Sequence, residues 1–170
     1  EDVQGLLQST LLGLCASAVA GAMCDPDSKD VSVSGLSNLP SDLLQLILDT
    51  MCAHQSLTKE TLSLLADADA QSFHRLALRA ADATSSVSAL CCWRLDDSWM
   101  LPLRRFDNLE ILELGSCFSL TDGALAPCLR AMPLLRVLDL DRCKLITDEG
   151  VSPVAEGHNP RLVELCVGGT

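Results

Sequence analysis

Two stretches of the sequence repeat nearly the same pattern, and this repetition limits the possible folds more than any other feature. Residues 109–125 read LEILELGSCFSLTDGAL, and residues 135–151 read LRVLDLDRCKLITDEGV. Leucines, a cysteine and a Thr-Asp pair recur at the same places, with an offset of about 26 residues. A single unit of this length cannot bury its apolar face alone, so such units stack side by side. The sequence therefore predicts an array of stacked repeats.

Each repeat predicts a short strand, a turn and a return helix. Leu112 and Leu114 alternate with other residues and predict a strand whose leucines face the core. Cys117 takes a small, buried position after the strand, and the Thr-Asp pair that follows is expected to cap the return helix. Because repetition at constant spacing stacks equivalent residues, we expect Cys117 and Cys143 to be buried beneath adjacent parallel strands.

Weaker copies of the pattern extend the array in both directions. Residues 92–100, CWRLDDSWM, match 117–125 position by position, and residues 161–167, RLVELCV, open a further repeat. That last repeat stops at Thr170 without a return helix, so we expect it to be incomplete, the chain to be truncated there, and the open end to need a cap. The predicted strands lie near residues 73–79, 84–90, 109–115, 135–141 and 162–168.

The first part of the chain has a different character and predicts helices. Apolar spacing indicates helices over about residues 4–23, 41–54 and 58–65, and the Asp-, Ser- and Gly-rich segment 24–38 predicts a loop between the first two. The expected fold is thus of the α/β class, with a helical region at 1–70 followed by repeats at 71–170.

Composition excludes several classes of function. A net charge of −11 disfavours nucleic acid as a partner, because phosphates would be repelled. The longest apolar run, 11–23, is too short for a bilayer-spanning helix, so we expect no membrane partner. The nine cysteines are odd in number and two occupy equivalent repeat positions, which favours free thiols and a cytoplasmic or nuclear location. No ligand spacing indicates a metal, and we expect no cofactor.

No motif of the chain indicates catalysis. It contains no G-x-S-x-G, no glycine-rich phosphate loop and no Cys/His pair with an orienting residue. Clustered carboxylates at Asp96-Asp97 and at Asp148-Glu149 are explained as helix caps. We therefore expect no enzyme activity in this chain.

The motif at residues 117–125 and 143–151, C-x-x-L/I-T-D-x-x-L/V, resembles the cysteine-containing leucine-rich repeats, which occur largely in substrate receptors of ubiquitin ligases. The resemblance covers about the last hundred residues. It implies a leucine-rich-repeat solenoid with parallel strands on its concave face and a protein or peptide substrate bound there. The candidate substrate face comprises Glu113, Asp139, Asp141, Arg142 and Glu164. Its carboxylates would attract a basic partner, although a solvated face in an acidic protein is the commoner explanation for them.

The segment Thr10–Val19 fits the elongin BC box, [S/T/A]-L-x-x-x-C-x-x-x-[A/I/L/V], with Leu11, Cys15 and Val19 on one helical stripe. Residues 38–48, NLPSDLLQLIL, resemble the cullin box that follows a BC box. This order is similar to that of leucine-rich-repeat VHL-box receptors, including the Zyg-eleven type. The resemblance implies that the first stripe contacts elongin C within elongin B/C. It also implies that the second segment contacts cullin two through Leu39, Pro40, Leu43 and Leu44.

The resemblance thus implies the substrate-recognition subunit of a cullin-RING ubiquitin ligase, in which any chemistry belongs to partner subunits. Two alternatives remain open. The segment LPSDLLQLIL also resembles the start of an F-box that binds the Skp adaptor, but the Trp element that should follow is missing from residues 57–73. A third reading is a non-ligase scaffold, in which the repeats bind protein within a larger assembly and a Leu/Cys/Val stripe is an ordinary core face.

Overall fold

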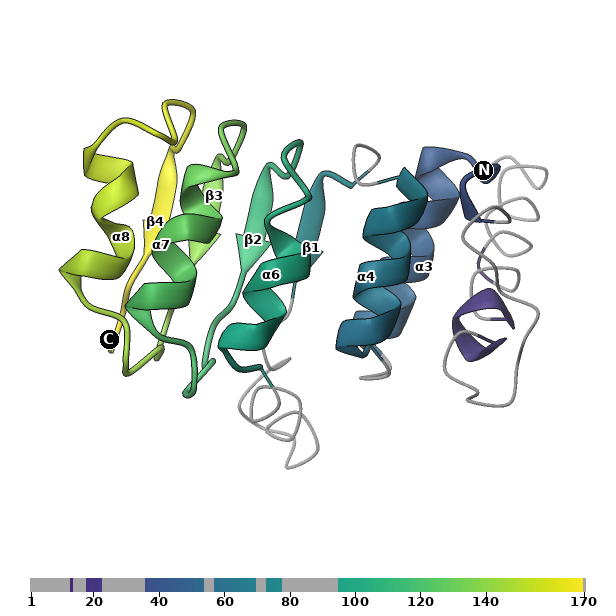
Figure 1. Cartoon of the computed structure of the whole chain (residues 1–170), viewed down its shortest axis with the longest axis horizontal. Helices are drawn as coiled ribbons and strands as arrows, with labels where there is room; N and C mark the ends of the chain where they lie inside the picture. Colours follow the sequence, from purple (N-terminus) through teal and green to yellow (C-terminus); the bar gives the residue numbers. More distant parts are fainter. Residues whose placement is uncertain are drawn as a thin grey trace, which may run out of the picture.

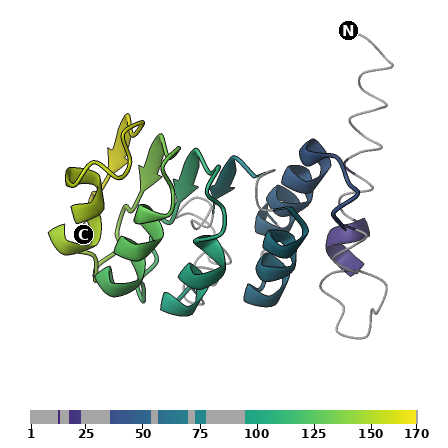
Figure 2. The same cartoon turned by 45° about the horizontal axis from the view of Figure 1, so that its top comes forward.

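The computed structural model describes residues 13, 18–22, 36–53, 57–69, 73–77 and 95–169. In these ranges the chain forms a mixed α/β fold around a four-stranded parallel sheet with the strand order β1-β2-β3-β4. Figure 2 shows the strands along one side of the molecule and α6, α7 and α8 along the other. The elements are α3 (Ser41–Ala53), α4 (Lys59–Asp69), β1 (Arg75–Ala77), the 3₁₀ helix η2 (Asp97–Trp99), α6 (Met100–Leu103), β2 (Ile111–Glu113), α7 (Asp122–Arg130), β3 (Val137–Asp139), α8 (Asp148–Ala155) and β4 (Glu164–Cys166).

Units made of a strand and a helix follow one another along the long axis of the molecule (Figure 1). Residue 111 pairs with 137, which is 26 positions on, and residue 137 pairs with 164, which is 27 positions on. The spacing from β1 to β2 is wider, since Arg75 pairs with Ile111. Four of the five predicted strand segments thus contain a strand, and the fifth, 84–90, lies outside the described residues.

Helices α3 and α4 form because each has a defined start and one apolar face. The backbone N–H groups of Leu43 and Leu44 donate to Pro40 O at the start of α3. Thr58 caps α4, because its Oγ1 accepts from Thr61 N at 3.2 Å while Thr61 Oγ1 accepts from Thr58 N at 2.9 Å. The buried faces of the two helices comprise Leu44, Ile47, Leu48, Met51, Leu62 and Leu65.

The core runs from α3 through the sheet to α8 as one cluster of buried side chains. Leu112 and Leu138 are buried at paired positions of adjacent strands. Cys117 and Cys143 are also buried, as predicted, and Cys143 Sγ donates to Leu114 O at 3.1 Å. A hydrogen bond from the Cys117 thiol lowers the pKa of Cys143, against the opposing effect of burial. The parallel strands and buried thiols predicted for this part of the chain are therefore confirmed.

Carboxylates link the start of one helix to the start of the next. Asp97 accepts hydrogen bonds from the N–H and Oγ1 of Thr121 at 2.8 and 2.7 Å. Asp122 accepts the same pair of bonds from Thr147, again at 2.8 and 2.7 Å. A Cβ at position 150 would collide with Asp122 Oδ1, so Gly150 allows this close approach. The Asp side chains thus join neighbouring repeats.

The predicted capping role of the Thr-Asp pair is correct for one repeat and wrong for the other. Thr147 Oγ1 accepts from Glu149 N at 3.3 Å and caps α8. Thr121 precedes α7 but makes no side-chain capping bond. Its hydroxyl donates to Asp97 in the preceding unit, just as the hydroxyl of Thr147 donates to Asp122, so the bond between units recurs where the local cap does not.

No helix in the described part of the chain is long and apolar enough to cross a membrane.

Candidate protein-binding surface

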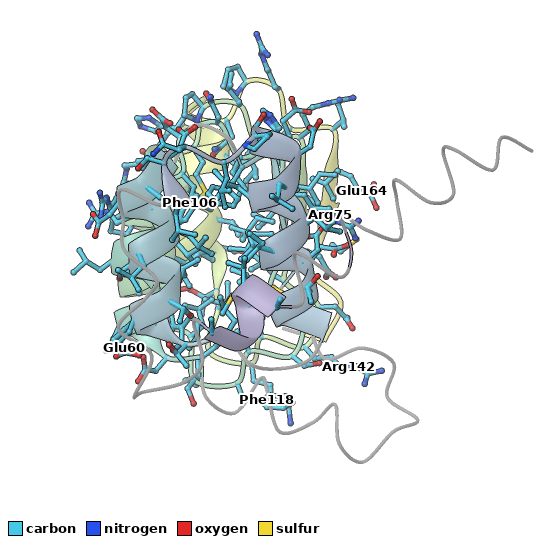
Figure 3. All side chains as sticks on the ribbon, turned by 90° about the vertical axis from the view of Figure 1, so that its right-hand side faces the viewer. Glu60, Arg75, Phe106, Phe118, Arg142 and Glu164 are labelled. Atoms are coloured by element: carbon cyan, nitrogen blue, oxygen red, sulfur yellow. The ribbon has the colours of Figure 1, made fainter. Side chains whose placement is uncertain are left out.

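The outward side chains of the sheet form a continuous strand face. This strand face consists of two rows, because side chains alternate between the core and the outside along each strand. One row contains Arg75, Ile111, Val137 and Glu164, and the other contains Glu113, Asp139 and Cys166. Figure 3 shows Arg75 and Glu164 projecting on this side of the molecule, with Glu60 on the opposite, helical side. Glu164 therefore belongs to a different row from Glu113 and Asp139.

The carboxylates of the strand face have partners within the chain. Glu113 Oε2 lies 3.3 Å from Nη2 of Arg75, and only 15 % of the Glu113 side chain is exposed. Asp139 Oδ1 accepts from Asp141 N at 2.9 Å, and Asp141 Oδ2 lies 3.4 Å from Arg142 Nε. The face is thus a mixture of charges with an acidic excess. Arg75 was not included in the candidate substrate face predicted from the sequence. The pairing of Leu76 with Leu112 places the neighbouring Arg75 on this face.

The lower rim of the strand face is set by a left-handed residue that recurs in three units. Ser116, Arg142 and Gly169 have φ values of 67°, 60° and 71°. Ser116 N donates to Asp141 O, and Arg142 N donates to Gly168 O, both at 2.6 Å. These bonds hold an unfavourable conformation for non-glycine residues and fix the exposed Arg142 at the rim, where Figure 3 shows it.

The strand face also presents a thiol. Cys166 is exposed in β4, and its Sγ lies 3.9 Å from Glu164 Oε1. Desolvation, followed by the negative charges of Asp139 and Glu164, raises the pKa of this thiol. Burial raises the pKa of Cys128, within α7, to about 12. The two cysteines therefore differ in access, although both disfavour the thiolate.

We expect iodoacetamide to separate these thiols in the native protein. At pH 8 it should modify Cys166, and faster as the pH rises, because a raised pKa leaves little thiolate at pH 8. Cys117, Cys128 and Cys143 should stay unmodified because they are buried. Peptide mass spectrometry identifies each site, and the urea-unfolded chain, in which every cysteine reacts, is the control. Labelling of Cys117 and Cys143 as fast as Cys166 would contradict their place beneath the strands.

The candidate adaptor contacts are only partly described. Leu11 and Cys15 lie outside the described residues, and the half-buried Val19 packs against the core cluster. Among the candidate cullin contacts, Leu44 is fully buried, while Leu39 and Leu43 are half-buried and pack against the same cluster. Pro40 is exposed. The leucines of this segment thus hold α3 to the body of the molecule, and Pro40 remains open to a partner.

Helix α3 covers the outer edge of β1. Gln45 Oε1 accepts from His74 N and Arg75 N at 3.2 and 3.3 Å, and its Nε2 donates to Arg75 O at 2.9 Å. The side chain therefore satisfies backbone groups that an edge strand would leave open to another strand. Sequence reasoning missed this role, because a glutamine between apolar residues of a helix gives no signal of a contact 30 positions away.

Within the ranges that the structure describes, no three His, Cys, Asp or Glu side chains gather where they could hold a metal ion. No protein-family model matches the sequence, and no curated protein is significantly similar to it.

Proposed function

We propose that the chain is a leucine-rich-repeat protein that binds another protein across its strand face, as the substrate-recognition subunit of a cullin-RING ubiquitin ligase. The observation that carries the protein-binding part is the register of the sheet. Equivalent residues of successive units stand side by side, so every unit adds one outward side chain to each row. A surface built in this way offers many adjacent contacts to an extended partner, which is how repeat proteins bind.

The charge of the strand face favours a basic partner. Arg75 and Arg142 each lie beside one carboxylate, whereas Glu164 is exposed and has no ion pair within the described residues. The overall charge of −11 adds to the attraction of a Lys- or Arg-rich segment. The half-buried Ile111 and Val137 lie between these charges and supply apolar contact area. The proposed substrate is therefore a basic protein segment with some apolar side chains.

The ligase part of the proposal rests on the order of the two amino-terminal motifs before the repeats. The BC-box pattern places Leu11, Cys15 and Val19 on one helical stripe for elongin C. In the segment that resembles a cullin box, the leucines pack against the core of this chain. Its contact to a cullin would therefore be made through Pro40 and the exposed start of α3. In this scheme the chain supplies proximity between substrate and ligase, and partner subunits supply the chemistry.

Co-elution of the purified chain with elongin B/C tests the ligase proposal. We expect a complex with elongin B/C that Leu11→Ala or Cys15→Phe abolishes, since loss of a buried anchor costs roughly 2 kcal/mol or more. Leu101→Ala is the matched control, because Leu101 is a 69 % exposed leucine on α6, away from the motif. The urea midpoint of each variant should equal that of the parent. Failure to bind elongin B/C would reject the proposal for this chain.

The inward packing of Leu39, Leu43 and Leu44 favours the scaffold as second candidate. A scaffold would bind neither elongin B/C nor the Skp adaptor, and Leu11→Ala would lower its urea midpoint because that leucine would belong to its own core. An F-box protein would instead co-elute with the Skp adaptor and lose it on substitution of Pro40. Co-elution with elongin B/C and with the Skp adaptor, together with the urea midpoint of Leu11→Ala, therefore distinguishes the ligase receptor, the F-box protein and the scaffold.

A further inference from the structure

A hollow lies between α4 and α6 on the helical side of the molecule, where Figure 3 shows Glu60. The two helices are neighbours, and α7 packs against the other side of α6 (Figures 1 and 2). The hollow consists of two adjoining parts of about 380 and 400 Å³ that share Ser63, Leu101 and Pro102, and its lining is mostly apolar. Because described elements flank it on both sides, it is an internal feature of the array.

Leu101 is the main apolar side chain of this hollow, and it is 69 % exposed. The match between residues 92–100 and 117–125 makes Leu101 the equivalent of Ala126 in α7, and the next repeat has Ser152 at this place. The later units thus have small side chains at a position where α6 exposes a large apolar one. Since the packing of the repeats does not require that side chain, its exposure in a hollow fits contact with a partner.

The charged residues around the hollow carry the second, independent observation. Its lining includes Lys59, Arg104 and Arg105, against the one carboxylate of Glu60. Arg105 pairs with Asp67, whereas Lys59 and Arg104 have no ion pair within the described residues. A chain of net charge −11 thus has a local excess of cations here. Charge complementarity therefore selects an acidic partner for this hollow.

The spacing of the two cations without an ion pair sets the kind of segment that fits. Lys59 Nζ donates to Ser98 Oγ at 3.4 Å, and Ser98 precedes Arg104 by six residues through η2 and α6. Helices of these types rise about 1.5–2 Å per residue, so the two cations stand roughly 9–12 Å apart. Two turns of an α-helix span about 11 Å, and residues halfway between lie on the same face. A helix with carboxylates two turns apart and apolar residues between them therefore matches the hollow.

We propose that the hollow between α4 and α6 binds an acidic amphipathic helix of another protein. The apolar residues of that helix cover Leu101, and carboxylates one turn before and one turn after them pair with Lys59 and Arg104. The strand face has an acidic excess, so the two sides of the molecule bind partners of opposite charge. This inference goes beyond the proposed function, because it adds a second binding surface that the ligase proposal does not use.

Fluorescence anisotropy of a labelled peptide tests the proposal. The probe is an alanine-based peptide of about 20 residues, which is long enough to form a helix. It carries two adjacent leucines, with a glutamate one turn before them and another one turn after them. Titrated with the whole chain it should bind saturably, and more weakly as the salt concentration rises. The same peptide with glutamines in place of the glutamates should bind roughly tenfold more weakly.

Substitutions in the protein locate the binding site. Leu101→Ala should weaken binding of the acidic peptide roughly tenfold, and Lys59→Gln and Arg104→Gln should weaken it about threefold each. Leu145→Ala and Arg161→Gln are the matched controls, since they change an exposed leucine and an exposed arginine that do not line the hollow. Both should leave the affinity for the peptide unchanged.

No saturable binding at millimolar protein would overturn the proposal, and so would equal affinity for the acidic and the glutamine peptide. A lower urea midpoint for Leu101→Ala would also overturn it, by showing that the chain itself covers the hollow. Self-association in sedimentation that Leu101→Ala abolishes would assign the hollow to a second copy and overturn it as well. The Leu101→Ala chain should still bind elongin B/C, so failure of this proposal and failure of the ligase proposal are separate results.

Discussion

Leu138→Ala should lower the free energy of unfolding by about 3 kcal/mol, because it opens a cavity in the middle of the sheet. Leu138 is fully buried in β3, between β2 and β4, and beneath it lies the core cluster. The neighbouring backbone is held by ladder bonds on both sides, so the site cannot collapse freely around an alanine. Urea denaturation followed by circular dichroism measures the loss.

Leu165→Ala provides the matched control for this prediction. Leu165 is the register partner of Leu138 and has the same side chain, but it is 40 % exposed. Its truncation removes less apolar area from the interior and leaves no closed cavity, so we expect a loss of about 1 kcal/mol or less. Equal losses at the two positions would mean that β4 is covered in solution as completely as β3, or that the order of the strands is different.

The repeated part of the fold could be predicted from the sequence because burial has a period there. The leucines and cysteines of 109–125 and 135–151 recur at one spacing, and equivalent residues that stack must form parallel strands. The wider spacing between β1 and β2 could not be predicted, since the 95–100 segment matches the turn of a repeat but no strand pattern of equal quality precedes it. The fold could therefore be predicted only where the repeat pattern of the sequence is strong.

The candidate surface was only partly predictable, for a different physical reason. An apolar stripe on a helix shows that a face is buried, but it does not show against what. Leu44 fits a partner-binding motif and is nevertheless fully buried in the core of this chain. Likewise, Glu113 was expected to project from an open acidic row, whereas Arg75 from a less regular unit pairs with it. Residue types in the sequence show which chemical groups a surface can carry. Only the register of the strands shows which of these side chains lie next to one another.

The role of Asp122 was hidden for a related reason. A Thr-Asp pair before a helix is a common start signal, so its simplest interpretation is local capping. The structure uses the carboxylate between units, where it accepts from both the N–H and the Oγ1 of Thr147. The recurrence of the pair at the repeat spacing was the available signal, because local capping alone does not require that spacing to be conserved between the two units.

Asp122→Ala should therefore destabilise the protein by about 2 kcal/mol, since two hydrogen bonds to a charged acceptor are lost and solvent weakens each of them. Asp148→Ala is the matched control. Both residues are the first of their helices, so both substitutions remove the same favourable interaction with the helix dipole, worth about 0.5 kcal/mol. Of these two aspartates, only Asp122 has a threonine partner within the described residues, so the difference between the two losses isolates the link between repeats.

A cycle with Thr147 completes the test of this link. Thr147→Ser keeps the hydroxyl and should leave stability within about 0.5 kcal/mol of the parent, whereas Thr147→Val removes it. Because Thr147 Oγ1 also accepts from Glu149 N, the valine variant loses a helix cap in addition to its bond with Asp122. The double variant Asp122→Ala/Thr147→Val should thus be less destabilised than the sum of the single losses. Additive losses in urea denaturation, or equal losses for Asp122→Ala and Asp148→Ala, would show that the carboxylate does not join the repeats.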